Sequence, residues 1–256
     1  MADYSYFLYN GKSSAAFGIR IHNEMVLSVP ERDMTTVEVM GRDGDLTIDN
    51  KRLKPFVKQI KFDIKIDKDR IDNGADGRAM LDTALRISDW LNVKGYHDFE
   101  WSMYPQFVYR ATIIDPYSIE DTIRSRGRGV IKVKFHPVMY YKDKTHERKI
   151  GSDTNIFNKG NVEALPLIRL VPKAGQKDFD VYNNGNVWFS VRGITTETII
   201  DSETMQVTNE QGSANANLAV RRPLFPKLQI GDNLITFDEN QVAGIYITPR
   251  LGRTAL

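Results

Sequence analysis

The sequence predicts a mainly β protein with two domains and one helix, and three observations support this class. Short apolar segments that alternate with polar residues recur along the chain, separated by Gly, Asn, Asp and Pro. Only one segment, at residues 78–93, has a helical period instead. A polar stretch without any period, residues 142–149, divides the chain. We therefore expect a β-sandwich-like first domain of α+β character and a second domain that is a β-sandwich.

Residues 30–67 form the stretch around which the first domain is predicted to be organised. Val37 and Val39 fall on one side of a short alternating strand. A turn signal follows, because Asp-Gly between strand residues is typical of a hairpin; the turn comprises Gly41, Arg42, Asp43 and Gly44. We predict that this strand belongs to the main sheet of the domain.

The second half of the same stretch alternates almost perfectly. Ile60, Phe62, Ile64 and Ile66 share one side, and Lys61, Asp63, Lys65 and Asp67 share the other. The apolar side is expected to meet a core. The charged side fits either neighbours of complementary charge or solvent, and solvent is the simpler interpretation.

The predicted helix covers about residues 77–94. Its apolar positions recur at three- and four-residue intervals: Leu81, Ala84, Leu85, Ser88 and Leu91, with Met80, Ile87 and Trp90 widening the face. Asn73 or Asp76 can cap its start, and Gly95 is placed to end it. We expect the helix to pack across an open face of the sheet.

The remaining strands are predicted from alternation between turn residues. In the first half they cover residues 4–9, 17–22, 25–29, 99–103, 107–114 and 129–135; in the second half 165–171, 179–182, 187–191, 198–201, 206–208, 233–238 and 244–248. Asn10-Gly11 and Asn184-Gly185 supply hairpin turns. The predicted organisation is a first domain at residues 1–141, a linker at 142–150 and a second domain at 151–256.

Composition narrows the classes of function. The chain has 256 residues with 35 basic and 33 acidic side chains, and neither half is strongly basic, so no motif predicts contact with nucleic acid. Cysteine is absent, which excludes disulfides and thiol catalysis. The first residues lack the features of a signal peptide, and no apolar segment approaches the ~20 residues of a membrane span, so no membrane contact is expected.

Searching for catalytic or metal-binding patterns yields little. The histidines at 22, 97, 136 and 146 share no metal-ligand spacing, and Asp67, Asp69 and Asp72 depart from a calcium loop. Asp98 with Glu100, or Asp201 with Glu203, could form a carboxylate pair for glycoside hydrolysis. Such pairs are common on strands, so no catalytic, cofactor-binding or metal site is predicted.

Two surface features are candidates for binding. Arg124, Arg126 and Arg128 could meet an acidic partner or a phosphate backbone, although a solvated hairpin tip is the commoner meaning of such a pattern. Trp188 alternates with Val187 and Phe189 and so shares a face with polar residues. It could stack on a sugar, or lie at a rim or an interface.

Several segments together resemble a known family. YFLYNGKSSAAFGIRI, VPERD, VEVMGRDGDLTI and FHPVMYY in the first half, and NKGNVEALPLIRLV, VYNNGN, IIDSETMQV, PLFPKLQIGDNLITF and ITPR in the second, are similar in order and spacing to the distal tail proteins of long non-contractile-tailed bacteriophages. The resemblance covers nearly the whole chain. It implies a first domain with one helix and a second domain of galectin-like or carbohydrate-module-like fold.

The resemblance also implies a function. Members of this family form a ring, expected to be hexameric, at the tip of the virion tail after assembly in the host cytoplasm. The ring joins the major tail tube protein and the tape-measure protein to the tail-associated or receptor-binding proteins. Gly41, Arg42, Asp43, Gly44, Arg124, Arg126 and Arg128 are then candidate interface residues, with no cofactor. The alternatives are a carbohydrate-binding adhesion module, with Trp188 as a glycan contact, and a β-sandwich glycan hydrolase.

Overall fold

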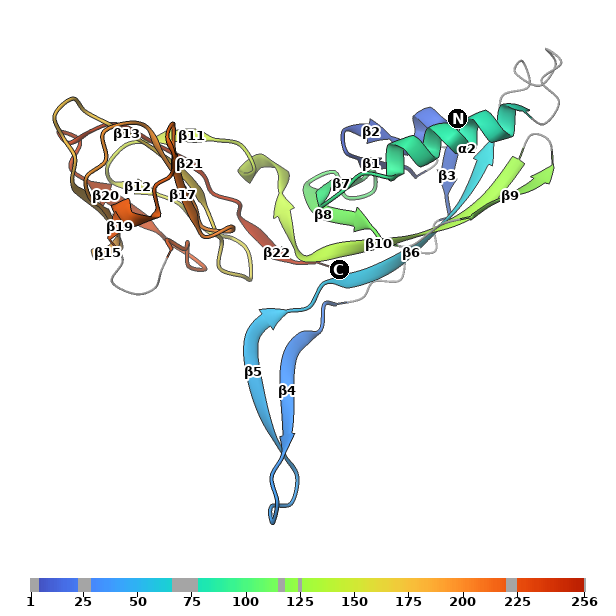
Figure 1. Ribbon diagram of the computed structural model, residues 1–256, viewed down its shortest axis with the longest axis horizontal. Coiled ribbons are helices and arrows are strands. Elements are labelled where there is room, and N and C mark those ends of the chain that lie inside the picture. Colours follow the sequence, from blue (N-terminus) through green and yellow to red (C-terminus); the bar gives the residue numbers. More distant parts are fainter. Residues whose placement is uncertain are drawn as a thin grey trace. The chain divides into compact units, whose positions relative to one another are not determined.

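The computed structural model describes residues 5–22, 29–65, 78–114, 118–123, 126–219 and 225–255. It divides into two compact units (Figure 1). Unit 1 comprises Met1–Met139 with Thr254–Leu256, and unit 2 comprises Tyr140–Arg253. The strand predicted at residues 25–29 falls almost wholly outside the described residues. The predicted capping loop before the helix, with Asn73 and Asp76, also lies outside them.

Unit 1 is built on one nine-stranded sheet in which β2, β1, β7, β8, β10, β6 and β3 follow one another, while β9 and β22 also pair with β10. The elements are β1 (Phe7–Tyr9), β2 (Lys12–Ser13), η1 (Ser14–Phe17), β3 (Ile19–Ile21), β6 (Phe56–Lys65), α2 (Arg78–Leu91), β7 (His97–Trp101), β8 (Phe107–Ile113), β9 (Ser118–Ile123), β10 (Arg126–Tyr141) and β22 (Gly252–Thr254). Its longest ladder joins β10 to β6 over ten antiparallel pairs, from Arg126 opposite Lys65 to Phe135 opposite Phe56.

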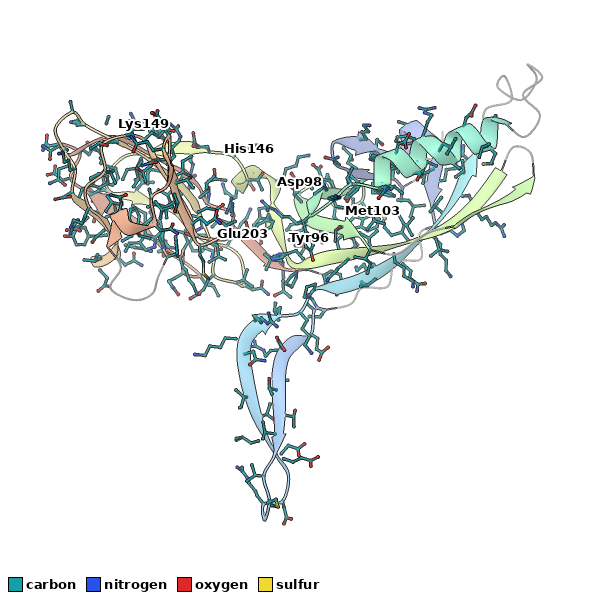
Figure 2. The ribbon with its side chains drawn as sticks, in the orientation of Figure 1. Tyr96, Asp98, Met103, His146, Lys149 and Glu203 are labelled. Carbon is teal, nitrogen blue, oxygen red and sulfur yellow. The ribbon has the colours of Figure 1, made fainter. Side chains whose placement is uncertain are left out.

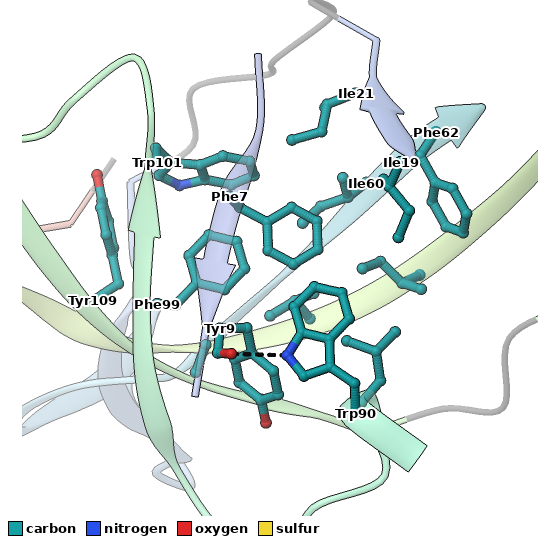
Figure 3. Packing of buried hydrophobic residues seen from close by; sticks show 14 of the residues in the cluster. Phe7, Tyr9, Ile19, Ile21, Ile60, Phe62, Trp90, Phe99, Trp101 and Tyr109 are labelled. Carbon is teal, nitrogen blue, oxygen red and sulfur yellow. Dashed lines mark hydrogen bonds between the residues drawn. The ribbon is translucent and has the colours of Figure 1, made fainter. Parts of the chain in front are cut away.

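The core of unit 1 lies between this sheet and α2, so the helix takes the place of a second sheet. Inward-facing aromatic rings dominate it (Figure 3). Phe99 stacks on Phe7 with ring centroids 5.0 Å apart, and Trp90 of α2 stacks on Phe17 at 4.5 Å. The Trp90 indole N–H donates a hydrogen bond of 2.8 Å to the Tyr9 carbonyl, so the buried polar group is satisfied. These contacts fix α2 on the sheet.

The predicted helix is confirmed, but the side that it buries is rotated from the expected one. Met80, Thr83, Ile87, Trp90 and Leu91 are buried, whereas Leu81 and Leu85 remain 59% and 55% exposed. Leucines occupy both sides of the helix, so their spacing alone did not identify the buried stripe. Tryptophan and methionine fill the space over the sheet instead.

The strand that carries Val37 does not belong to the main sheet, so the prediction that placed it there was wrong. β4 (Arg32–Glu38) and β5 (Asp45–Leu53) form a separate two-stranded sheet (Figure 1). Val37 is 41% and Val39 42% exposed. The turn predicted at residues 41–44 does join the two strands. By contrast, the prediction for β6 is confirmed at the described positions, since Ile60, Phe62 and Ile64 are buried.

Unit 2 is a two-sheet sandwich. One sheet has the order β11, β21, β13, β16, β17, β18, and the other β12, β20, β14, β15, β19. The strands are β11 (Arg148–Ile150), β12 (Thr154–Asn155), β13 (Leu167–Pro172), β14 (Phe179–Asn183), β15 (Asn186–Val191), β16 (Thr198–Asp201), β17 (Gln206–Asn209), β18 (Gly212–Ser213), β19 (Leu218–Ala219), β20 (Leu234–Phe237) and β21 (Val242–Thr248), with 3₁₀ turns η2 (Lys142–Lys144) and η3 (Asn215–Asn217).

Apolar side chains from both sheets meet in one core, as a sandwich requires. Ile168, Ile200 and Ile247 enter it from the first sheet, and Val181 and Ile235 from the second; all five are fully buried. The mainly β prediction is therefore confirmed. Asn10-Gly11 and Asn184-Gly185 form the expected tight turns, with positive φ at all four residues.

Residues 142–150, predicted as a linker, are folded into unit 2 instead. They form η2 and β11, and β11 pairs with β21 from Arg148 opposite Ile247 to Ile150 opposite Ile245. A three-residue edge strand with polar outward side chains has too few positions to show a period, which is why the segment resembled a linker. The chain returns to unit 1 at Thr254, and Ala255 is buried in the unit 1 core.

Candidate assembly surfaces

The β4–β5 hairpin presents two faces of different chemistry. Residues directly opposite each other in an antiparallel pair share a face. Val37 lies opposite Leu46 and Thr35 opposite Ile48, which makes one face apolar. Glu38 lies opposite Asp45, and Thr36 opposite Thr47, on the other face. Asp49, paired with Met34, adds a third carboxylate there. The hairpin thus has an apolar face and an acidic face.

Both faces lie open in the described structure. Figure 2 shows side chains projecting on either side of the hairpin ribbon. Leu46 and Ile48 are 41% and 47% exposed, and Met40 beside the turn is 99% exposed. Apolar side chains gathered on one open strand face are typical of an interaction surface. The turn at residues 41–44 is also exposed, so all four of its candidate interface residues are accessible.

Ion pairs and hydrogen bonds at the base of the hairpin hold its register. Arg52 pairs with Asp33, whose side chain is mostly buried, and Arg32 contacts Asp49 at 3.0 Å. The hydrogen bond from Arg52 lowers the pKa of Asp33. The pKa of Asp49 is also lowered, mainly by the hydrogen bond from the Lys51 backbone N–H and to a smaller extent by Arg32. The register shifts between Arg32 and Met34 at this point. These contacts hold the pairing of the two strands at the base of the hairpin.

The outward face of β3, β6 and β10 is basic. Ile60, Phe62 and Ile64 of β6 and Ile131, Val133 and Phe135 of β10 point into the core, so their neighbours point outward. The described basic side chains on this outward face are Arg20, Lys61, Lys65, Arg128, Lys132 and Lys134. Asp63 is the one described acidic side chain among them, and the backbone of Glu120 on β9 pairs with Arg128. The ladder therefore collects cations that lie far apart in the sequence.

The three candidate arginines do not form one loop. Arg124 lies outside the described residues, and Arg126 begins β10, with its side chain not described. Arg128 is on the basic face, where its Nε lies 3.4 Å from Asp63 Oδ1. His22 approaches the other oxygen of Asp63 at 3.0 Å. A role of these arginines in an interface stays a prediction. The sequence did not identify the lysines of β6 and β10 as their neighbours, because only the register brings them alongside.

In unit 2, Trp188 is partly buried and contributes to the fold. It is half-buried against the core, and its indole N–H donates a hydrogen bond of 2.8 Å to the Lys227 carbonyl. The ladder between β14 and β15 shifts register beside it, between Val181 and Tyr182. Its predicted exposure is only partial, and a role in glycan contact stays a prediction.

The carboxylates proposed for catalysis lie in different settings. Asp98 and Glu100 are neighbours on β7, with Asp98 exposed. Asp201 and Glu203 instead share Arg250, whose Nη1 lies 2.6 Å from Asp201 Oδ1 and 3.1 Å from Glu203 Oε2. Burial alone would raise the pKa of Asp201, but the hydrogen bond and charge of Arg250 bring it below its ordinary value. The Tyr140 hydroxyl also contacts Glu203 at 3.2 Å. This is the geometry of a structural ion cluster.

The described parts of the chain contain neither a metal-binding cluster nor a membrane-spanning helix. No group of three or more His, Asp or Glu residues there could hold a metal ion. None of the described helices is long and apolar enough to cross a membrane. His97 contacts the Lys94 carbonyl at 2.9 Å, and His136 packs edge-on to Tyr96. The notable surfaces are thus those of the hairpin and the basic sheet.

The described residues form a β-rich protein of two units. A sheet covered by one helix carries a two-stranded hairpin with two different faces, and a two-sheet sandwich follows it. No protein-family model matches the sequence, and no curated protein is significantly similar to it. A solved structure does match: the Dit protein of phage SPP1, described as a paradigm of the hub adsorption apparatus in phages that infect Gram-positive bacteria. The match has a TM-score of 0.66 at 14% identity and covers 96% of this chain and 97% of that one. The chain therefore has the fold of a phage distal tail protein, as the sequence predicted.

Proposed function

We propose that this protein is a non-enzymatic hub of a phage tail tip, in which copies of the chain join into a ring. The observation that carries the proposal is the end-to-end fold match to a hub protein of a phage adsorption apparatus. It spans both units, so it concerns the whole architecture and not one widespread β-sandwich. Fold alone does not carry function, and the surfaces of this chain supply the second argument.

The hairpin supports self-association. An isolated two-stranded hairpin is marginal in water, because it has no core of its own. In this hairpin an apolar face that includes Val37, Leu46 and Ile48 stays open in the single chain. A cyclic oligomer uses a heterologous interface, in which one patch meets a different patch on the next copy. A projecting hairpin is suited to reach such a neighbour.

The ring is proposed to have six copies and to lie at the tip of the tail. Its partners would be the tail tube and tape-measure proteins on one side and the tail-associated or receptor-binding proteins on the other. The turn at residues 41–44 and Arg128 are then interface candidates. The resemblance in sequence motifs supports these finer assignments, and the fold match is compatible with them.

Native mass spectrometry of the purified chain over a range of concentrations tests the proposal. We expect a discrete closed oligomer, with six copies as its main species, and ring-shaped particles in negative-stain images. A chain that stays monomeric at every concentration and does not bind purified tail tubes would overturn the proposal. Turnover of a glycan that is lost in Glu203→Gln would also overturn it and favour a hydrolase.

A further inference from the structure

Two hairpin turns, one in each unit, have the same sequence and the same backbone. Asn10-Gly11 joins β1 to β2, and Asn184-Gly185 joins β14 to β15. All four residues have positive φ, as in a type I′ turn, and all four are exposed. The Asn10 backbone N–H donates to the Asp98 carbonyl at 3.1 Å, and that of Asn184 donates to the Leu234 carbonyl at 2.9 Å. The two turns are therefore matched in sequence, exposure and backbone restraint.

An Asn-Gly pair is able to modify itself. The backbone nitrogen of the glycine attacks the side-chain amide carbon of the asparagine, and a cyclic succinimide forms as the amide nitrogen leaves. The leaving nitrogen takes up the proton of the glycine N–H and departs as ammonia. Water then opens the ring at either carbonyl, which gives aspartate or isoaspartate. Glycine favours the attack because it has no Cβ to hinder its nitrogen. The amide group must be free to turn toward that nitrogen.

The two turns differ in how the asparagine side chain is held. The Oδ1 atom of Asn184 accepts a hydrogen bond of 2.9 Å from the Leu234 backbone N–H, and its Nδ2 donates one of 2.9 Å to the Asp232 carbonyl. Both ends of this amide are thus fixed against the chain that enters β20. The side chain of Asn10 has no hydrogen-bond partner among the described residues. Its amide is therefore free to rotate.

We propose that Asn10 is a site of spontaneous deamidation in the folded protein, with water as the only co-reactant, and that Asn184 is protected. Aspartate at this position adds a negative charge to an exposed turn. Isoaspartate also adds one carbon to the backbone of the two-residue loop. Because loop length fixes the register of a hairpin, we expect this product to loosen the pairing of Leu8 with Ser13.

Peptide mapping by mass spectrometry, on the purified chain kept in warm and mildly alkaline buffer, tests the proposal. In the folded protein Asn10 should convert about tenfold faster than Asn184 or more, because two hydrogen bonds of ordinary net strength must open first at Asn184. In urea the two sites should convert at similar rates, since glycine follows both. The third pair, Asn73-Gly74, lies outside the described residues and is mapped on its own peptide.

Two outcomes of the mapping would overturn the proposal. One is conversion of Asn184 in the folded protein at the rate of Asn10 or faster. The other is a folded chain in which Asn10 stays intact over the time that the unfolded chain needs to convert it. Neither outcome depends on the ring, so this proposal and the hub proposal fail independently.

Asn10→Gly and Asn184→Gly form a matched pair of variants. Glycine adopts the left-handed conformation of the turn and removes the amide. On isoelectric focusing, Asn10→Gly should gain acidic species more slowly than the wild type, whereas Asn184→Gly should gain them at the wild-type rate. An isoaspartate-specific methyltransferase should label residue 10 in aged wild type and in aged Asn184→Gly. An Asn10→Gly protein that acquires acidic species as fast as the wild type would contradict the assignment.

Discussion

The hairpin and the sandwich of unit 2 are both built from strands with one apolar face, but only the sandwich buries that face. The sandwich buries one face of each sheet against the other, so Ile168 and Val181 are fully buried from opposite sides. The hairpin leaves Val37 and Leu46 about 41% exposed on a face of comparable chemistry. A strand pair with apolar residues is therefore not by itself evidence of a core. The difference is that unit 2 covers its own apolar faces, whereas the described residues leave the apolar face of the hairpin open.

The largest expected effect comes from the core of unit 1. Phe99→Ala removes the ring that packs against Phe7, Trp101 and Phe135, at centroid distances of 4.7–5.0 Å. It should lower the free energy of unfolding of unit 1 by about 3–5 kcal/mol. Chemical denaturation followed by tryptophan fluorescence reports this, since Trp90 and Trp101 lie in that core.

Phe157→Ala is the matched control in unit 2. Phe157 is 59% exposed, so its removal should change stability by no more than about 0.5 kcal/mol. A Phe99 variant that unfolds within 1 kcal/mol of the wild type, roughly the cost of an ordinary substitution, would show that the aromatic cluster is not what holds unit 1 together.

The second effect concerns the ion cluster of unit 2. Arg250→Met leaves Asp201 and Glu203, with side chains 20% and 19% exposed, without their cation. We expect a loss of about 2–3 kcal/mol at pH 7, because two partly desolvated carboxylates lose the cation that they share. Thermal unfolding of the wild type, Arg250→Lys and Arg250→Met measures it, and the lysine variant should fall in between.

The pH dependence of the same variant sharpens the test. The pKa of Asp201 is lowered in the folded protein, so its contribution to stability is present above the unfolded value of about 3.9 and is lost as the pH falls through the folded value. In Arg250→Met, burial without the cation raises the pKa of Asp201 instead, so the gap between wild type and variant should narrow as the pH falls from 7 to 3. A gap that is constant from pH 7 to pH 3 would mean that Arg250 acts through packing and not through its charge.

These comparisons also show how far the sequence alone could lead. The helix, the Asn-Gly turns and the seven predicted strands of unit 2 were correct, because each depends on a local period or a local turn. The very short strands β11, β12, β18 and β19 were missed, since two or three residues cannot show a period. The exposure of Val37 could not be predicted from the sequence either. Alternation identifies the apolar side of a strand, but it does not show whether another element covers that side. The basic face depends on the pairing of β6 with β10, which are about sixty residues apart, so only the register reveals it.

The smallest effect on stability is expected in the hairpin. A change there should affect assembly and leave folding almost unchanged, unlike a change in a buried core. Leu46→Ser/Ile48→Ser should leave the unfolding of the single chain within about 0.5 kcal/mol of the wild type, because both side chains are already half exposed. If the apolar face is covered in the ring, the same change should raise the concentration at half-assembly by roughly tenfold or more, since each side chain loses apolar burial at the interface.

The matched control for the hairpin is Val187→Ser/Met205→Ser in unit 2, where both residues are about 60% exposed. It removes a similar apolar area from a region that we do not place in the interface, so assembly should be unchanged. Analytical ultracentrifugation of the three proteins distinguishes the cases. Equal assembly of all three would mean that the apolar hairpin face is solvated in the ring, and that any self-association depends on other surfaces. A large loss of stability in the hairpin variant would instead show that Leu46 and Ile48 support the fold of the single chain despite their exposure.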